Sequence, residues 1–159
     1  MKNLMDYGLV SLLEQEILQN KKPYLGICLG MQVLCNESFE HGHHRGLGWI
    51  DARVVEIPGK SGVKIPHVGW DDAVVRGEPH IFKGLSPRAT FYFDHSFYVH
   101  CFEREIVAST TTYGIEFTSS IQKGHIWGTQ FHPEKSQRSG LKLLRNFTNF
   151  VSEKKRGRS

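Results

Sequence analysis

The stretch from Tyr24 to Gln32 reads YLGICLGMQ and places a cysteine between two glycines, where an apolar run breaks. Residues 24–27 are typical of a short buried strand, and a helix is predicted over 30–38. A reactive side chain at a sharp strand-to-helix bend is a nucleophile elbow, where glycines avoid collisions beside the bend. A helix N-terminus under the sulfur would lower the pKa of the Cys28 thiol. The alternative is a buried core cysteine, a common environment for this residue.

A second motif, GTQFHPEKS at 128–136, places His132 and Glu134 directly after a predicted strand. Pro133 between them ends the strand ladder and fixes the backbone. A cysteine nucleophile needs a base, and the base needs an acidic group that sets its tautomer and stabilises its charged form. Taken alone, His-Pro-Glu is more typical of a turn with a surface ion pair. Together the motifs predict a triad of Cys28, His132 and Glu134 that meets across one pocket mouth.

These two motifs resemble those of the class I (triad) glutamine amidotransferases. Three further stretches, KIPHVGWD (64–71), FYFDHSFYV (91–99) and SGLKLLRNF (139–147), narrow the resemblance to the glutaminase subunits of imidazole glycerol phosphate synthases. It covers residue 1 to about residue 151. It implies an α/β fold, a flavodoxin-like three-layer sandwich with a mixed sheet. It also implies attack of a cysteine on the side-chain amide of glutamine, a glutamyl thioester, and release of ammonia, with no metal or other cofactor.

The resemblance assigns roles to individual residues. Cys28 matches the nucleophile, His132 the general base and acid, and Glu134 its orienting partner, while the backbone N–H of Leu29 matches an oxyanion donor. The positions that match the glutamine-binding residues are Gly30, Gln32, Glu40, His95, Ser96 and Phe97. Those that match the face toward the synthase subunit are Trp70, Tyr92 and Lys135. Without the resemblance, Gln32 and Glu40 would be interpreted as a solvated helix face, and His67 and Trp70 as loop packing.

The whole chain limits the class of protein. It has 159 residues, 39% of them hydrophobic and 23% charged, which predicts one globular domain over 1–152. No apolar run approaches the roughly 18 residues of a membrane span, and no secretory signal is present, so a soluble protein is predicted. Three cysteines without framework spacing favour a reducing cytoplasm. The basic tail 153–159 is interpreted as a solvated end, with a nucleic-acid arm as the alternative.

Hydrophobic periodicity and turn residues predict the elements that position the motifs. A helix is expected over 3–20, and a final helix over 137–152 with Leu141, Leu144, Phe147, Phe150 and Val151 on one face. Strands are expected at 24–27, 52–57, 90–100 and 105–113, with a hairpin over 117–131 that turns at Lys123-Gly124 and a short punctuated segment at 64–71.

Two groups of residues are set aside as functional candidates. His41, His43 and His44 lie within four residues, but no cysteine or carboxylate at a familiar ligand spacing joins them, so no metal site is predicted. Cys35 is expected in the core and Cys101 at the end of a strand. Neither has a candidate base nearby in sequence, so both are expected to be inert.

The sequence departs from the family at its start. Members carry a strand, a helix, a second strand and a glycine-rich loop ahead of the helix that matches 3–20, and the chain lacks this section. Without it, residues 24–27 are expected to expose a strand edge. The loop supplies one oxyanion donor in the family, and loss of such a donor typically costs about 10²–10³ in rate. The chain alone is therefore expected to be a poor glutaminase.

Three other functions remain open at this point. A paralogue of the same chemistry could supply ammonia to a sugar amidotransferase in surface-polysaccharide synthesis, because the triad meets only glutamine. A truncated remnant could bind the partner and catalyse nothing. A cysteine peptidase or related hydrolase could use the same architecture, although the glutamine contacts indicate a pocket for a small amino acid.

Overall fold

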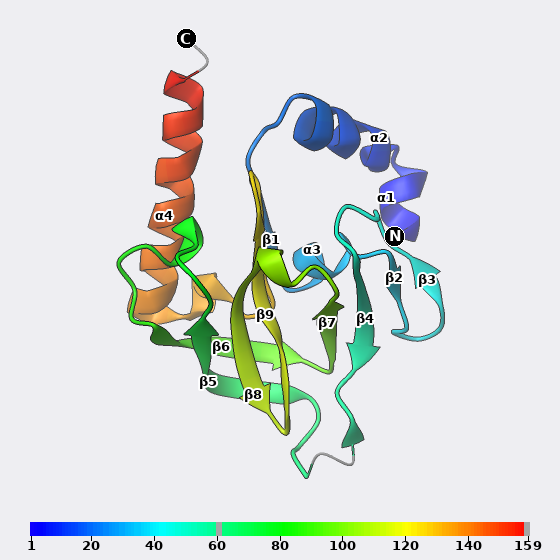
Figure 1. The fold of residues 1–159 in the computed structure, drawn as a ribbon. Helices are drawn as coiled ribbons and strands as arrows, with labels where there is room; N and C mark the ends of the chain where they lie inside the picture. The colour runs from blue at the N-terminus through cyan, green and yellow to red at the C-terminus, as the bar shows by residue number, and fades with distance from the viewer. Residues whose placement is uncertain (60–61, 158–159) are drawn as a thin grey trace.

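The computed structural model describes residues 1–59 and 62–157 of the chain (Figure 1). The helical elements are α1 (Lys2–Asp6), α2 (Leu9–Leu13), the π-helix η1 (Glu14–Gln19), α3 (Leu29–Gln32), the 3₁₀ turns η3 (His80–Phe82), η4 (Arg104–Ile106) and η5 (Pro133–Lys135), and α4 (Gln137–Arg156). The strands are β1 (Tyr24–Ile27), β2 (Glu37–Ser38), β3 (His44–Arg45), β4 (Ala52–Glu56), β5 (His67–Val75), β6 (Arg88–His95), β7 (Phe97–Cys101), β8 (Val107–Tyr113), β9 (Ile115–Lys123) and β10 (Ile126–Thr129).

One mixed sheet contains all the strands of the described residues. The main path of the sheet runs β3-β2-β4-β7-β9-β8-β5-β6. Strand β10 lies outside this path and pairs with both β9 and β1. The β1–β10 and β2–β4 pairs are parallel, whereas the other pairs are antiparallel. The mixed sheet predicted from the sequence is therefore confirmed. Its strands β1 and β10 carry the two candidate motifs at their carboxyl ends.

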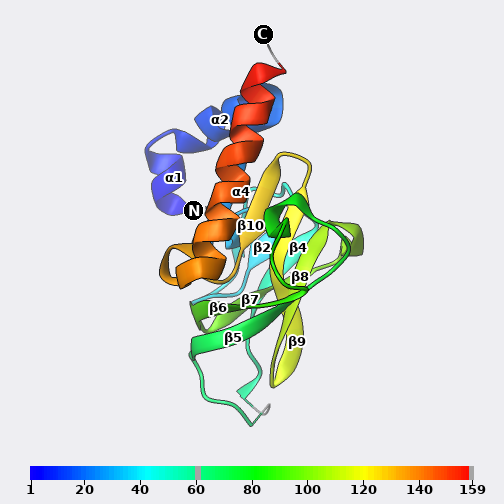
Figure 2. The ribbon, with the colours of Figure 1, turned by 90° about the vertical axis from the view of Figure 1, so that its left-hand side faces the viewer.

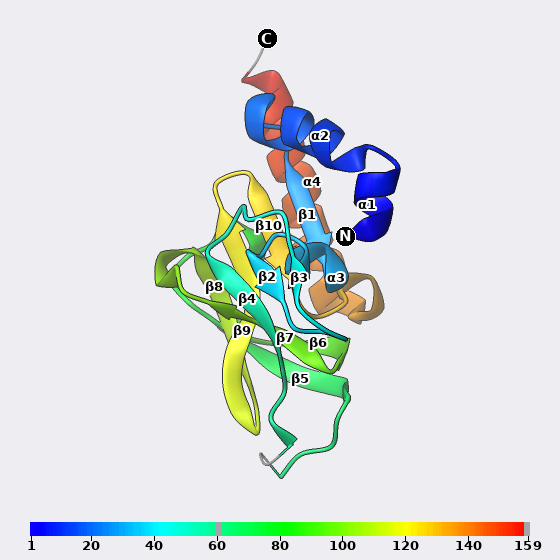
Figure 3. The ribbon, with the colours of Figure 1, turned by 90° about the vertical axis from the view of Figure 1, so that its right-hand side faces the viewer.

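Two apolar clusters lie on opposite faces of the β1–β10 pair, as expected for side chains that alternate along strands. Tyr24 and Ile126 join the cluster with Ile17 and Met31, on the side of η1 and α3. Leu25 and Trp127 join the other cluster, which contains Leu143, Phe147 and Phe150 of α4. Figures 2 and 3 show α4 and the N-terminal helices on the two sides of this part of the sheet. The predicted three-layer arrangement is confirmed here.

Two helix predictions differ from the structure, one by an interruption and one by its length. The expected helix over 3–20 is interrupted at Tyr7 and Gly8, where Gly8 adopts a left-handed φ of 67°. No residue of α1 or α2 is buried, so packing does not hold the two pieces in line. The helix expected over 30–38 is only α3, because the chain turns into the parallel β2–β4 pairing at Glu37. Sheet pairing there overrides the helical period.

The strand predictions were closer to the structure. Residues 24–27 form β1 as predicted, and 52–57 contain β4. Only residues 67–71 of the segment 64–71 are in a strand, and this strand, β5, is longer than expected because antiparallel pairing with β6 continues past Gly69. The single strand expected over 90–100 is two strands, β6 and β7, separated at Ser96. The hairpin of β9 and β10 is confirmed.

The predicted face of the last helix is correct in part, because Phe147 and Phe150 pack against the core. Leu141 is 66% exposed, whereas Leu143 is fully buried and Asn146 is buried. The Asn146 amide donates to the carbonyls of Ile81 and Lys83, so a polar side chain on this face is satisfied by η3. The helix also continues to Arg156, so residues 153–156 of the expected tail are helical, and 158–159 lie outside the described residues. No helix among the described residues has the length and hydropathy of a membrane span.

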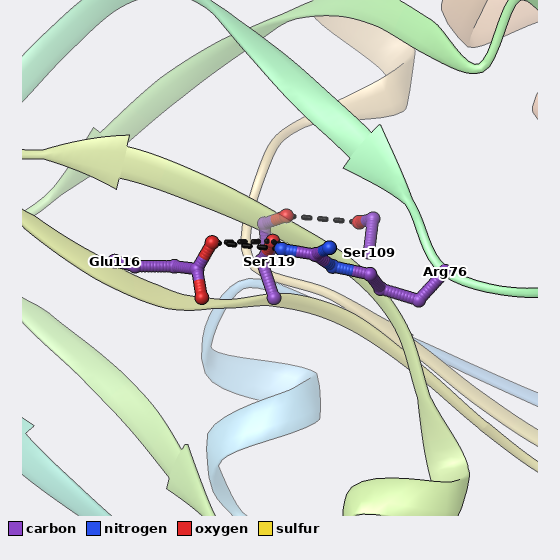
Figure 4. Close-up of polar contacts among 5 residues, drawn as sticks. Arg76, Ser109, Glu116 and Ser119 are labelled. Carbon is purple, nitrogen blue, oxygen red and sulfur yellow. Dashed lines mark hydrogen bonds and ion pairs between the residues drawn. The ribbon is translucent and has the colours of Figure 1, made fainter.

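The β8–β9 pair carries polar side chains on both its buried and its exposed surface (Figure 4). The hydroxyls of Ser109 and Ser119 lie 2.8 Å apart and are fully buried. On the exposed surface, Arg76 forms an ion pair of 2.8 Å with Glu116. Both serine hydroxyls therefore have a partner, whereas the buried Thr111 hydroxyl of β8 has none among the described residues.

Candidate active site

Cys28 lies at the bend between β1 and α3, in a conformation that its residue type rarely adopts. Its φ is 49° and its ψ is −107°, and a positive φ is strained for a residue that carries a Cβ. The Cys28 amide donates to the carbonyl of Thr129 at 2.7 Å, and its own carbonyl accepts from Met31 and Gln32. The predicted nucleophile elbow is the observed local geometry. Its strained bend is held by β10 on one side and α3 on the other.

The two flanking glycines have different reasons to be present. A Cβ added to Gly26 would lie 2.3 Å from the Gly30 carbonyl oxygen, so β1 and α3 approach too closely for a side chain. A Cβ on Gly30 would meet only the Tyr24 hydroxyl, at 3.7 Å, which is an ordinary contact. The collision expected at both glycines is therefore confirmed for Gly26 and wrong for Gly30.

Gly26→Ala is expected to destabilise the fold by about 1–3 kcal/mol, because the added methyl pushes the start of α3 away from β1. Gly30→Ala is the matched control and is expected to unfold at the same urea concentration as wild type, or at a higher one, since alanine favours a helix by about 1 kcal/mol over glycine. Urea unfolding followed by circular dichroism measures both. Equal stability of the two variants would contradict this account of the bend.

Burial dominates the electrostatics of the sulfur. It raises the pKa of the Cys28 thiol, and a backbone hydrogen bond at Leu29 lowers the pKa by less. Asp94 and Glu40 also raise the pKa of this thiol. The start of α3 therefore lowers the pKa of the thiol as expected, through Leu29, but the net shift is upward because the cost of burying a thiolate is larger. The sulfur is a thiol at neutral pH and needs a base.

His132 and Glu134 form the acid–base pair that the second motif predicts. Nδ1 of His132 lies 2.7 Å from a carboxylate oxygen of Glu134. A carboxylate only accepts, so Nδ1 carries a hydrogen and Nε2 of the neutral ring is left with its lone pair. The His132 side chain is 18% exposed and that of Glu134 is 46% exposed. The imidazole therefore has the tautomer of a general base.

Ser136 holds this loop against β6, which the sequence analysis did not anticipate. Its hydroxyl donates to the His132 carbonyl at 2.6 Å and accepts from the Tyr92 amide at 2.9 Å. The His132 amide donates to the Tyr92 carbonyl at 2.8 Å. Ser136 is buried. The only sign of this role in the sequence was its position within the second motif, four residues after His132.

Cys28 and His132 follow the carboxyl ends of two adjacent parallel strands, β1 and β10, in which Ile27 pairs with Thr129. Within the described residues no hydrogen bond joins their two side chains directly. The residue that contacts the sulfur is Gln130, whose amide donates to Cys28 Sγ at 3.5 Å. Gln130 is fully buried and was not among the predicted site residues. The same sheet edge thus carries the thiol, the imidazole and a buried amide in contact with the sulfur.

Three of the predicted residues line one small pocket beside the elbow. Leu29, Gln32 and Glu40 border a cavity of about 130 Å³, together with Ser38 and the β3 segment. Glu40 is half-buried, and Leu29 is 62% exposed. The interpretation of Gln32 as a solvated residue is wrong, because it is 8% exposed. The structure thus places Leu29, Gln32 and Glu40 together.

The β6–β7 junction contacts Gln32, one of the residues that line this pocket. The amide nitrogen of Gln32 donates to the Phe97 carbonyl at 3.1 Å and to the Gln130 side-chain oxygen at 3.2 Å. Both of its hydrogens are used inside the protein, so the Gln32 side chain has only its own oxygen left for a ligand. The backbone of His95, Ser96 and Phe97 is therefore joined to the elbow helix through one side chain.

Trp70, Tyr92 and Lys135, which match the partner-facing positions of the family, lie next to one another in the structure. The rings of Trp70 and Tyr92 meet edge to face at 5.8 Å, and the Lys135 ammonium lies 5.6 Å from the Tyr92 ring centre. Trp70 is 48% exposed, as is typical of a large apolar side chain in an interface. This surface adjoins the loop of His132 and Glu134, because Lys135 directly follows Glu134.

His67 is a buried residue of β5, not loop packing. Its ring stacks on Tyr113 at 3.8 Å and on Phe93 at 4.7 Å, and its Nδ1 lies 3.0 Å from Nε2 of His95. Burial lowers the pKa of both His67 and His95 to about 4. Asp71 lies 3.5 Å from Nε2 of His67 and favours a charged ring, but the desolvation cost prevails.

The free energy of unfolding is expected to fall as the pH drops from about 6.5 toward 4. In that window the unfolded chain protonates these two histidines and the folded chain does not, so each contributes a slope of up to about 1.4 kcal/mol per pH unit. Urea titrations at pH 7, 6 and 5 measure the slope. His67→Phe removes one titrating group and is expected to flatten it, whereas His100→Phe at an exposed site is the control. Identical slopes in all three proteins would contradict the pKa values.

The histidines and cysteines set aside in the sequence have the following surroundings in the structure. His43 contacts Glu37 at 2.8 Å and stacks on Phe39. Within residues 1–59 and 62–157 no group of three metal-ligating side chains is assembled. Cys35 is fully buried and Cys101 ends β7, and burial raises the pKa of Cys35 to about 12 and that of Cys101 to about 11.

With this geometry established, comparison with known proteins defines the class. Residues 5–150 match the family described as glutamine amidotransferase class-I, and the chain belongs to that family. Two solved glutamine amidotransferases share the fold at low sequence identity. One superimposes with a TM-score of 0.69 at 18% identity, covering 95% of this chain and 72% of the other. The other, from Thermotoga maritima, has a TM-score of 0.56 at 22% identity, covering 95% and 56%.

Curated relatives narrow the assignment within the family. The imidazole glycerol phosphate synthase subunit HisH 1 of Campylobacter jejuni (strain RM1221) is 46% identical over 147 residues, covering 92% of this chain and 73% of the relative. The HisH subunit of Aquifex aeolicus (strain VF5) is 47% identical over 147 residues, covering 92% and 70%. The chain therefore belongs with the HisH subunits of imidazole glycerol phosphate synthase.

Proposed function

We propose that this chain is the glutamine-hydrolysing subunit of an imidazole glycerol phosphate synthase. The observation that carries the proposal is the 46% identity with a HisH subunit over 92% of the chain. The elbow cysteine and the His132–Glu134 pair, which follow adjacent parallel strands, support it. The ammonia passes to a synthase subunit that forms imidazole glycerol phosphate and an aminoimidazole carboxamide ribotide in histidine biosynthesis.

In the proposed reaction, His132 Nε2 removes the Cys28 proton as the sulfur attacks the side-chain amide carbon of glutamine. The backbone N–H of Leu29 donates to the developing oxyanion. The same imidazole, now charged and stabilised by Glu134, protonates the leaving nitrogen, so ammonia departs and a glutamyl thioester remains. Water, activated by the neutral imidazole, then hydrolyses the thioester to glutamate and the free thiol.

Binding of glutamine is assigned to the pocket of Leu29, Gln32 and Glu40 and to the adjoining backbone. The Gln32 oxygen and the Glu40 carboxylate are acceptors for the substrate's ammonium group. The backbone of Gly30 and of His95, Ser96 and Phe97 is assigned to the amino-acid end of the substrate. The surface of Trp70, Tyr92 and Lys135 is assigned to the synthase subunit, since its exposed rings and cation adjoin the catalytic loop.

The test is a glutaminase assay with and without the synthase subunit. The chain in complex with that subunit is expected to release glutamate and ammonia from glutamine at a higher rate than the chain alone, and to leave asparagine intact. Copurification identifies the subunit, and recovery of a sugar amidotransferase in its place would contradict the assignment to histidine biosynthesis. Absence of glutamate formation in the complex would show a binding remnant instead of an enzyme.

A further inference from the structure

A hydrogen-bonded pair of buried histidines begins a connected path through the site. The carbonyl oxygen of Phe97 can only accept, so His95 Nδ1, at 2.8 Å, carries a hydrogen and donates to it. In the neutral ring, His95 Nε2 then has only its lone pair. His67 Nδ1, at 3.0 Å, must therefore donate to His95 Nε2. The carbonyl, which can only accept, therefore fixes the direction of both bonds, from β5 to the β6–β7 junction.

The path continues from that junction to the nucleophile. The Phe97 carbonyl accepts a second hydrogen bond from the Gln32 amide, at 3.1 Å. The same Gln32 nitrogen donates to Gln130 at 3.2 Å, and the Gln130 amide donates to Cys28 Sγ at 3.5 Å. All of these linking side chains are buried, with Gln32 8% exposed and Gln130 fully buried. In such an environment a hydrogen bond has little competition from water and restrains its partners strongly.

We propose that His67 is a positioning residue for glutamine hydrolysis, which donates to His95 and thereby fixes the Phe97 carbonyl that anchors Gln32 beside Cys28. The inference rests on the proposed function and adds to it a residue of β5 that lies outside the triad and outside the pocket of Leu29, Gln32 and Glu40. His67 reaches the substrate only through His95. Its removal frees the backbone assigned to the amino-acid end of glutamine, so the loss appears in KM.

If His67 had only a structural role, its aromatic ring would matter and its hydrogen-bond donor would not. His67 is stacked between Tyr113 and Phe93, and a phenylalanine at 67 would keep that stacking while it removes the donor to His95. An asparagine at 67 keeps the donor and loses the stacking, because its amide nitrogen reaches the position of the histidine Nδ1 but it carries no ring. The order of the two variants therefore separates positioning from packing.

The experiment compares His67→Phe and His67→Asn in the complex with the synthase subunit. His67→Phe is expected to raise KM for glutamine about five- to tenfold with kcat within about twofold, the cost of one buried hydrogen bond. His67→Asn is expected to recover most of the wild-type KM despite a lower unfolding midpoint. His67→Gln, whose amide reaches only the Nε2 position, repeats the expected loss if the phenylalanine variant does not fold.

A wild-type KM in His67→Phe, or a KM in His67→Asn as high as in His67→Phe, overturns the inference. If the wild-type complex has no glutaminase activity, the proposed function fails independently of this residue. The readout is then alkylation of Cys28 by iodoacetamide, resolved by peptide mass spectrometry. His67→Phe is expected to react about threefold more slowly than wild type, because a looser Gln130 stabilises the thiolate less. Equal rates overturn the inference.

Discussion

Cys28→Ala is expected to lower the glutaminase rate of the complex at least about 10⁴-fold, to the background of the assay. The covalent thioester requires the sulfur, and no described side chain beside the elbow offers a second nucleophile. Gln130, the residue in contact with Sγ, carries an amide that cannot replace it. Glutamate release measured with saturating glutamine gives the rate, and acid-quenched samples of wild type should contain a glutamyl adduct on the Cys28 peptide.

Cys101→Ala is the matched control, because Cys101 is a half-buried thiol whose sulfur contacts the Glu103 carbonyl and no base. It is expected to retain the wild-type rate within about twofold. Circular dichroism of both variants checks that the fold is intact. Retention of activity in Cys28→Ala, or an adduct on another cysteine in wild type, would disprove the assignment of the nucleophile.

Local sequence signals predicted the parts of the site that lie on single elements. The elbow at Cys28 was predictable because it depends only on the end of a strand and the residues directly after it. The His132–Glu134 hydrogen bond was predictable because the two residues are two positions apart with a proline between them. The burial of Leu143 in place of Leu141 was not, because helical phase depends on which face α4 turns to the sheet. The strength of the burial effect on the Cys28 pKa likewise depends on the assembled fold.

Sequence reasoning missed His67 and Gln130, whose partners lie far away along the chain. His67 and His95 are 28 positions apart, and Gln32 and Gln130 are 98 apart, so no local pattern relates them. The antiparallel register of β5 and β6 brings the first pair together, and the sheet edge at β1 and β10 brings the second pair to the sulfur.

Glu134→Gln is expected to lower the rate of the complex about 10³- to 10⁴-fold while leaving Cys28 in place. The carboxylate has two functions at 2.7 Å from His132 Nδ1. It keeps the hydrogen on Nδ1, so that Nε2 can accept the thiol proton, and its charge stabilises the imidazolium that forms. A glutamine amide removes the charge, and its N–H can donate to Nδ1 and shift the hydrogen to Nε2, where the ring is no longer a base.

The raised pKa of Cys28 makes this loss large. A buried thiol does not ionise by itself at neutral pH, so the rate depends on how well the imidazole accepts its proton. Raising the pH should therefore restore part of the activity of Glu134→Gln, because hydroxide then ionises the thiol without His132. Glu116→Gln, at an exposed carboxylate paired with Arg76, is the control and should match wild type. A wild-type rate in Glu134→Gln at neutral pH would show that His132 needs no orienting partner.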